Sequence, residues 1–174
     1  MERKGLIHIY TGDGKGKTTA SLGLAVRAAG FGMKVRMLQF LKSYGSSEHN
    51  VKIDNLTIET VEEKVKFVFN MTEEEKEENR LRNERRFREV VEECKNDGVG
   101  LLVLDEIIGA VFMEQISEET VIDFLKNKPE SLEVVMTGRD APESFIALAD
   151  YVSEIRKIKH PFDRGEMARK GIEF

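Results

Sequence analysis

The amino-acid sequence predicts an α/β fold in which a mainly parallel sheet is covered by helices on both faces. Strand-length apolar segments alternate with segments of helical pattern along the chain. Most of the strand segments are apolar at nearly every position, which is typical of parallel strands buried on both faces. Because no internal repeat or linker interrupts this pattern, we expect residues 1–174 to form a single domain.

The first elements flank a glycine-rich turn. Residues 6–10 form a short apolar run, which predicts a buried strand. Residues 18–29 are rich in Ala and Leu and are followed by glycines, so we expect a helix that ends there. A second strand is expected at 35–39. The polar segment 40–55 is expected to be a loop, and the alternating segment 56–61 a short strand.

A long helix is expected over residues 72–96. It opens with Thr72 followed by Glu75, a capping-box pattern in which each side chain bonds the other residue's backbone N–H. Its apolar residues recur at helical spacing and include Cys94, which we therefore interpret as a packing residue. The continuous apolar segment 101–104 predicts another buried strand.

The remaining elements follow the same alternation. A helix opening on a Ser-Glu-Glu-Thr sequence is expected at 117–127, and a strand at 134–137. A proline suited to a first helical turn begins the helix expected at 142–149. The last strand is expected at 151–158, and residues 159–174 form a polar tail.

Composition and charge exclude several classes of protein. The net charge is −5, with 40% hydrophobic and 34% charged residues. This balance indicates a globular protein and argues against nucleic acid as a partner, because neutralising phosphates requires a basic surface. No apolar segment has the length of a membrane helix or a signal peptide, so we expect a cytoplasmic protein with no membrane partner. A single cysteine excludes an internal disulfide.

The turn at residues 11–19, TGDGKGKTT, predicts a phosphate-binding loop. Glycines let the loop curl so that backbone N–H groups point at phosphate oxygens, with a helix N-terminus behind them. Lys17 supplies a mobile positive charge and Thr18 a hydroxyl for Mg²⁺, although Thr11 replaces the first glycine of the general motif. The sequence therefore predicts a P-loop NTPase-like fold that binds a nucleoside triphosphate, in the first place ATP, through Gly12, Asp13, Gly14, Lys15, Gly16, Lys17, Thr18 and Thr19.

Charged residues at two further strand ends are candidates for the same site. Asp105 and Glu106 follow the strand at 101–104, where a carboxylate can hold Mg²⁺ or Mn²⁺; capping of the next segment is the alternative for Asp105. Arg139 follows another strand and can reach a triphosphate or a sugar. Arg27 lies on the first helix. Considered alone, both arginines fit solvated surface residues.

Together these segments resemble the P-loop-type ATP:corrinoid adenosyltransferases, which act on cob(I)alamin or cob(I)yrinic acid a,c-diamide. The resemblance covers nearly the whole chain, and the same loop, with its lysine-glycine-lysine sequence and without the first glycine, occurs in that family. The matching segments are GDGKGKTT at 12–19, GLAVRA at 23–28, QFLK at 39–42, VLDE at 103–106, TGR at 137–139, ADYVSE at 149–154, KHPFDRG at 159–165 and ARKGI at 168–172.

The resemblance implies a reaction. The 5′-deoxyadenosyl group of ATP moves to the Co(I) centre of a reduced corrinoid and triphosphate is released, in adenosylcobalamin biosynthesis or salvage. Co(I) is the nucleophile, so no protein nucleophile is required. The resemblance also implies that ATP lies reversed relative to ordinary P-loop enzymes. Lys17 and the loop amides would hold phosphate, Thr18 and Glu106 the metal, while Arg27 and Arg139 would contact phosphate or nucleoside.

The resemblance also bears on the corrinoid and on partners. Phe67 and Phe69 match two family aromatics that help to displace the corrinoid's lower ligand, with core packing in a strand as the alternative. The N-terminal helix that covers the corrinoid in some members is expected to be absent, because the sequence begins almost at the first strand. His160 stays open as a cobalt ligand, whereas His8 is expected to be a strand residue. A homodimer and an electron-donating reductase are the partners that the family suggests.

The loop and the Asp105–Glu106 pair alone leave a second hypothesis open. They also fit a P-loop NTPase or a nucleotide-dependent switch module with a protein partner. The two hypotheses differ in the leaving group, which is intact triphosphate for the transferase and single phosphate for the NTPase.

Overall fold

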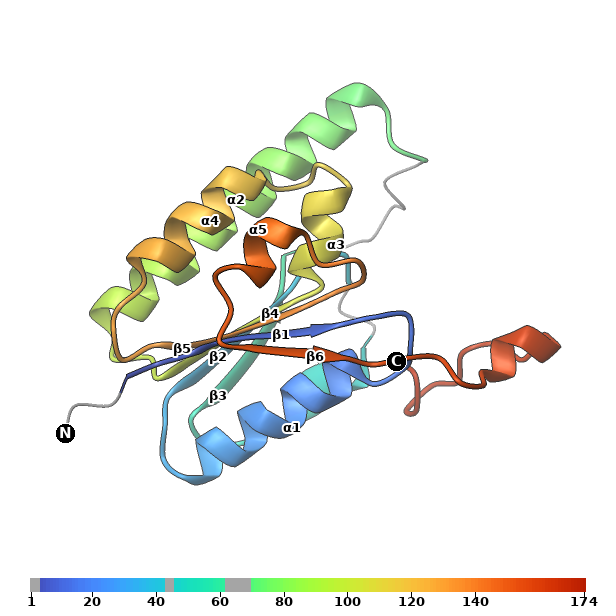
Figure 1. Cartoon of the computed structure of the whole chain (residues 1–174), viewed down its shortest axis with the longest axis horizontal. Helices are drawn as coiled ribbons and strands as arrows, with labels where there is room; N and C mark the ends of the chain where they lie inside the picture. Colours follow the sequence, from blue (N-terminus) through green and yellow to red (C-terminus); the bar gives the residue numbers. More distant parts are fainter. Residues whose placement is uncertain (1–3, 43–45, 62–69) are drawn as a thin grey trace.

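The structure, a computed structural model, describes residues 4–42, 46–61 and 70–174. In these residues, parallel strands form one sheet in the order β3-β2-β4-β5-β1-β6 (Figure 1), which confirms the predicted α/β class. Phe67 and Phe69 lie outside the described residues. The strands are β1 (Ile7–Thr11), β2 (Val35–Gln39), β3 (Leu56–Thr60), β4 (Leu101–Asp105), β5 (Glu133–Thr137) and β6 (Tyr151–Glu154).

Helices cover both faces of this sheet (Figure 1). Helix α1 lies on one face, and helices α2, α4 and α5 lie over the other, with α3 at the edge where the strands end. No helix of the described ranges combines the length and apolar character needed to cross a membrane. The helices are α1 (Lys17–Gly30), α2 (Glu73–Asn96), α3 (Ile107–Phe112), α4 (Glu118–Asn127) and α5 (Glu143–Ile146), with single 3₁₀ turns at Ser47–Asn50 and Pro161–Arg164.

The two faces are packed by different kinds of side chain. Helix α1 presents small residues to the sheet, with Ala25 fully buried beside Met37 and Val103, so its backbone approaches the strands closely. On the other face, the rings of Phe87 from α2 and Phe124 from α4 meet edge to face, with centroids 5.5 Å apart. The close approach of α1 holds the loop before it at the end of β1.

The capping box predicted for α2 is present. The Thr72 hydroxyl accepts the Glu75 N–H and the Glu75 carboxylate accepts the Thr72 N–H. Cys94 is buried, and burial raises the pKa of its thiol to about 12, which fits the packing role expected for it.

Two expected elements, the strand at 151–158 and the helix at 142–149, were wrong in extent, and one helix was missed. Helix α3 was not predicted, because Glu106 turns the chain with a left-handed φ of 61° and no side chain caps the helix. Strand β6 ends at Glu154 and α5 covers only Glu143–Ile146. Beyond Glu154 the chain leaves the sheet to contact the phosphate loop, a tertiary interaction that local pattern does not report.

Candidate functional site

The loop between β1 and α1 is shaped by glycines. Gly12 and Gly16 have φ values of 104° and 119°, a region that other residues rarely adopt. A Cβ at Gly12 would lie 2.4 Å from the Ile155 carbonyl oxygen, and the Gly14 N–H donates to that same oxygen at 2.7 Å. The loop is therefore fixed against the segment that follows β6.

Lys17 is held inside this loop. Its ammonium donates to the carbonyl oxygens of Gly12 at 2.7 Å and Gly14 at 2.9 Å, and the residue is 8% exposed. Burial lowers the pKa of Lys17, and the negative charge of Glu106 opposes this. The lysine is thus positioned at the start of α1, where backbone N–H groups favour an anion.

Asp105 lies at the centre of the site and is fully buried. Its Oδ1 accepts the Thr137 hydroxyl at 2.7 Å. Its Oδ2 accepts the Thr18 hydroxyl at 3.2 Å, the Gln39 amide at 3.1 Å and the Lys42 ammonium at 2.6 Å. No side-chain bond caps α3, so the alternative that Asp105 caps the next segment is wrong.

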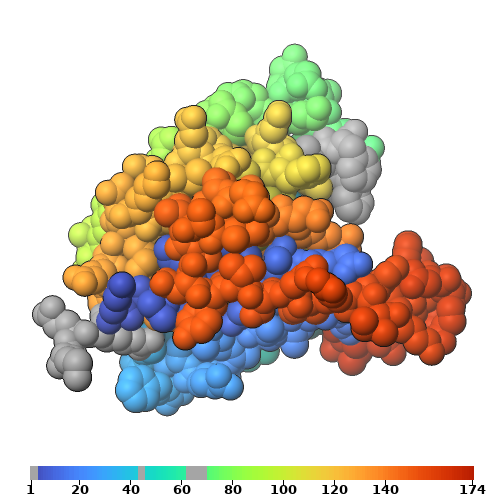
Figure 2. All heavy atoms as spheres, in the orientation of Figure 1, coloured from blue at the N-terminus to red at the C-terminus, as the bar shows by residue number. Residues whose placement is uncertain are grey.

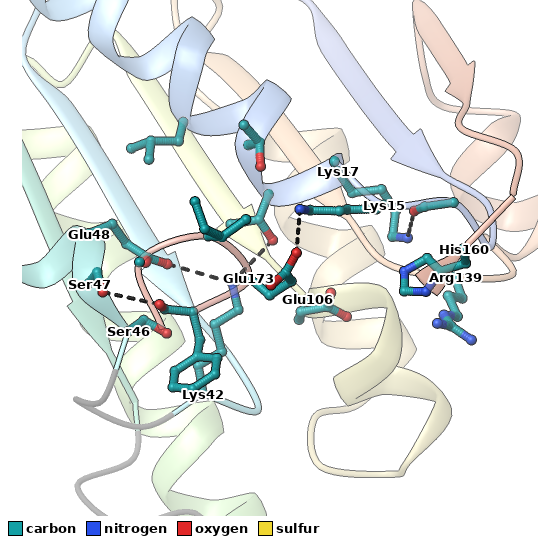
Figure 3. Close-up of a pocket in the computed structure, with 18 of the residues that line it drawn as sticks. Lys15, Lys17, Lys42, Ser46, Ser47, Glu48, Glu106, Arg139, His160 and Glu173 are labelled. Atoms are coloured by element: carbon teal, nitrogen blue, oxygen red, sulfur yellow. Dashed lines mark hydrogen bonds and ion pairs between the residues drawn. The ribbon is translucent and has the colours of Figure 1, made fainter. Parts of the chain in front are cut away.

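The Glu106 side chain lines a cavity beside the glycine loop (Figure 3). Its N–H donates to the Thr137 hydroxyl at 2.9 Å, and its left-handed backbone directs the chain away from the sheet. Burial raises the pKa of Glu106, and the neighbouring Asp105 charge raises it further. Thr137 therefore connects the two acidic residues: it donates to one side chain and accepts from the backbone of the other.

These residues border an open cavity of about 590 Å³ at the carboxyl ends of the strands. Lys42 and Glu48 lie on one side of it and Arg139 and His160 on the other, with Glu106 between them (Figure 3). The charged lining is mixed: the basic side chains are Lys15, Lys17, Lys42 and Arg139, and the acidic ones are Asp13, Glu48, Glu106 and Glu173.

The C-terminal residues form one wall of this cavity. The chain after β6 extends beyond the body of the molecule (Figure 2) and returns to the loop. The Glu173 carboxylate accepts from Lys15 at 2.8 Å and from the Arg169 guanidinium at 3.0 Å. The Ser47 hydroxyl donates to the Phe174 carbonyl oxygen at 3.1 Å. A carboxylate of the protein itself, that of Glu173, is thus paired with Lys15 of the phosphate loop.

The structure gathers most of the residues predicted for the site. Gly12 does not line the cavity but accepts from Lys17, and Asp105 lies beneath the cavity, bonded to Thr18. Arg27 lies on the exposed side of α1, outside the cavity lining, so its contact with ATP stays a prediction. The predicted residues that line the cavity are Asp13, Gly14, Lys15, Gly16, Lys17, Thr18, Thr19, Glu106 and Arg139.

The two histidines considered for cobalt have different positions. His8 Nε2 bonds Glu133 Oε1 at 2.6 Å and its ring stacks on Tyr151, within the sheet. His160 lines the cavity, and its Nδ1 accepts the Phe162 N–H at 3.2 Å. The position of His8 agrees with its expected strand role, and His160 stays open as a ligand.

Three residues of the site lie in the segments that matched the family, but the sequence prediction gave them no role in the site. Lys42, Gln39 and Thr137 all contact Asp105, although each lies at or just beyond the end of a different strand from it. Their polar character near a strand end and their place in the matching segments at 39–42 and 137–139 are the sequence signals that could have identified them. Which strand ends meet depends on strand order, which the sequence pattern does not specify.

The donor set fits a divalent cation. Thr18 Oγ1 and Asp105 Oδ2 lie 3.2 Å apart, and the Glu106 carboxylate faces the same cavity. The Lys42 ammonium already contacts both of those oxygens, so this position holds a positive charge in the protein as it stands. Hydroxyl and carboxylate oxygens beside a phosphate site are ligands that Mg²⁺ and Mn²⁺ prefer.

The fold and the loop place this chain in the class of P-loop nucleotide-binding proteins. A family model described as "ATP:corrinoid adenosyltransferase BtuR/CobO/CobP" matches residues 3–174. The corrinoid adenosyltransferase of Escherichia coli (strain K12) is 33% identical, with 100% of this chain and 88% of the relative aligned. Corrinoid adenosyltransferase CobA of Salmonella typhimurium is 34% identical with the same coverage, and the Pseudomonas aeruginosa enzyme is 30% identical over 99% of this chain and 85% of its own length.

The chain therefore belongs to the ATP:corrinoid adenosyltransferase family. This confirms the family predicted from the sequence motifs.

Proposed function

We propose that this protein transfers the 5′-deoxyadenosyl group of ATP to the Co(I) centre of a reduced corrinoid in cobalamin biosynthesis or salvage. A Co–C5′ bond forms with the electron pair of Co(I), the C5′–O bond breaks, and the oxygen leaves on the triphosphate. The family membership supports this reaction. The cobalt belongs to the substrate, and the protein's task is to orient ATP and stabilise its leaving group.

One observation carries the proposal on the structural side: the cavity beside the glycine loop is lined by basic side chains from separate segments. Lys17, Lys42 and Arg139 approach it from α1, from the end of β2 and from the end of β5. Triphosphate leaves with several negative charges, so cations fixed in place before the reaction lower its barrier. This arrangement suits a leaving group held along its whole length.

Each site residue has a specific role in this proposal. Lys17 exchanges its bonds to the loop carbonyls for phosphate oxygens, while Arg139 contacts another part of the triphosphate or the nucleoside. Thr18, Glu106 and Asp105 would hold Mg²⁺ or Mn²⁺, which supplies further positive charge to the leaving group.

We also propose a contact between Arg27 and ATP, corrinoid-facing roles for Phe67 and Phe69, a homodimer, an electron-donating reductase as a partner and a cytoplasmic location. The reductase follows from the chemistry, because Co(I) must be generated before it can attack.

The decisive experiment measures both products. Protein, ATP and Mg²⁺ are mixed with chemically reduced cobalamin, the corrinoid absorption spectrum is followed, and the released phosphate species are separated. We expect adenosylcobalamin and intact triphosphate in equal amounts. Lys17→Met should lower the rate about 100-fold or more, by analogy with other preorganised charge contacts, whereas Lys126→Met on α4 should not change it. Steady release of single phosphate without adenosylcobalamin would favour the NTPase or switch hypothesis instead.

A further inference from the structure

The Lys42 ammonium lies where the proposed metal ion would bind. Its Nζ is 2.6 Å from Asp105 Oδ2 and 3.1 Å from Thr18 Oγ1, two oxygens of the donor set that lie 3.2 Å apart. Glu48 Oε1 lies 3.8 Å from the same ammonium. An ammonium and a divalent ion cannot both contact those two oxygens at once.

The acidic residue beneath the cavity explains why a cation is needed there. Asp105 is fully buried, and a buried carboxylate requires compensating charge or donors. Thr137, Gln39 and Thr18 supply neutral donors, and Lys42 supplies the positive charge. The negative charge of Asp105 is therefore compensated within the protein without any metal.

The Lys42 side chain can also move away from Asp105. Its side chain is 22% exposed and lines the cavity, whereas Asp105 is completely enclosed. Lysine carries its charge on a flexible four-carbon stem, so the ammonium can move several ångströms without a change in the backbone. The cavity beside it is the one into which the triphosphate is proposed to enter.

We propose that Lys42 is a placeholder for the divalent cation, occupying the metal position until the metal–nucleotide complex enters and then contacting the triphosphate. The inference rests on the proposed metal site. It makes Lys42 a positioning residue with two opposite effects: it opposes metal binding to the nucleotide-free protein and favours binding of the metal–nucleotide complex. A lysine that only stabilises the fold would not produce effects of opposite sign.

The first measurement is Mn²⁺ binding without nucleotide, followed by the electron paramagnetic resonance signal of free Mn²⁺. We expect Lys42→Met to bind Mn²⁺ about tenfold or more tightly than the wild type, because the competing charge is gone. Lys15→Met is the matched control. It removes the same charge from the same cavity, but from a lysine paired with Glu173 instead of Asp105, so its change should stay within about threefold.

The second measurement is ATP binding by calorimetry in the presence of Mn²⁺ and without corrinoid. We expect Lys42→Met to weaken ATP binding about tenfold. Lys42→Gln provides a second variant if the methionine variant fails to fold, because its amide can still donate to Asp105 without a charge. The glutamine variant should change both affinities in the same directions.

Two outcomes separate the inference from the proposal beneath it. Equal Mn²⁺ affinities for the Lys42 and Lys15 variants, with ATP binding that still depends on Mn²⁺, would overturn the placeholder role alone. ATP binding by the wild type that is the same with and without Mn²⁺ would overturn the metal site itself. Tighter Mn²⁺ binding together with weaker ATP binding in the Lys42 variants would establish the placeholder.

Discussion

Thr137 offers the sharpest test of how the acidic pair is held. Replacing Thr137 by valine keeps the shape of the side chain and removes one hydroxyl. That hydroxyl donates to Asp105 Oδ1 at 2.7 Å and accepts the Glu106 N–H at 2.9 Å. The substitution therefore removes one donor from a buried carboxylate and leaves one backbone N–H without its acceptor.

The two losses set the size of the effect. A hydrogen bond to a charged group contributes about 1.5–3 kcal/mol, and an unpaired buried N–H costs about 1–3 kcal/mol. Asp105 keeps its donors from Thr18, Gln39 and Lys42, so the first loss falls at the low end of its range. We expect Thr137→Val to lower the free energy of unfolding by about 2–4 kcal/mol.

Urea unfolding of the nucleotide-free protein measures this directly, with Thr137→Ser as the control. Serine retains both hydrogen bonds and loses one buried methyl group, which costs about 1 kcal/mol. ATP affinity should fall for the valine variant and not for serine, because only valine releases the backbone turn at Glu106. Equal destabilisation by valine and serine would refute the reasoning, since packing alone would then account for Thr137.

Three further predictions concern single residues of the site. Gly138→Ala should lower the free energy of unfolding in urea by about 2–4 kcal/mol, because φ is 149° and a Cβ would lie 2.6 Å from that of Ile108. The control, Gly30→Ala at the end of α1, places its Cβ in open space and should not lower it. Equal effects of the two substitutions would contradict this explanation. Glu173→Gln should free Lys15 and strengthen ATP binding about threefold in calorimetry, a small effect because solvent screens the exposed ion pair. Glu166→Gln is the control and should not change ATP binding. Weaker binding by Glu173→Gln would show that the C-terminal residues assist binding of the nucleotide. For Glu106 the pKa is raised above 4.5, so the folded state binds more protons than the unfolded state above that pH, and ionisation costs stability as pH rises from 4.5 through the raised value. Glu106→Gln should therefore raise the melting temperature of the nucleotide-free protein at pH 7 but not at pH 4, and a lower melting temperature at pH 7 would contradict this.

The parts of the site that are local in sequence were predictable. The strand, the glycine loop and the helix that begins at Lys17 are consecutive, so one stretch of sequence specifies the backbone that faces phosphate. Asp105 and Glu106 were found in the same way, from their place directly after an apolar strand. The elements of the sheet followed from apolar runs, except where tertiary contacts ended them early, as at Glu154.

The parts that depend on strand order were not predictable. Strand β5 lies between β1 and β4, which places Thr137 beside Asp105, and β2 on the other side of β4 brings Gln39 and Lys42 to the same carboxylate. Nothing in the residues themselves specifies that order. Helix α3 was missed for a different, local reason: it begins at a left-handed turn at Glu106, and neither a glycine nor a capping side chain marks that turn in the sequence.

The site is charge-balanced before any ligand enters. Lys42 supplies a cation to Asp105 at the proposed metal position, and Glu173 supplies an anion to Lys15 at the phosphate loop. In the proposed reaction, a metal–nucleotide complex would replace these two internal ion pairs with contacts of the same sign, so that no charged group of the site is left unpaired. Because the internal contacts must be broken first, part of the binding energy of ATP is spent on releasing them, which lowers its affinity. The released lysines can then contact the triphosphate, whose charge increases as the C5′–O bond breaks, so the exchange favours the transition state over the bound substrate.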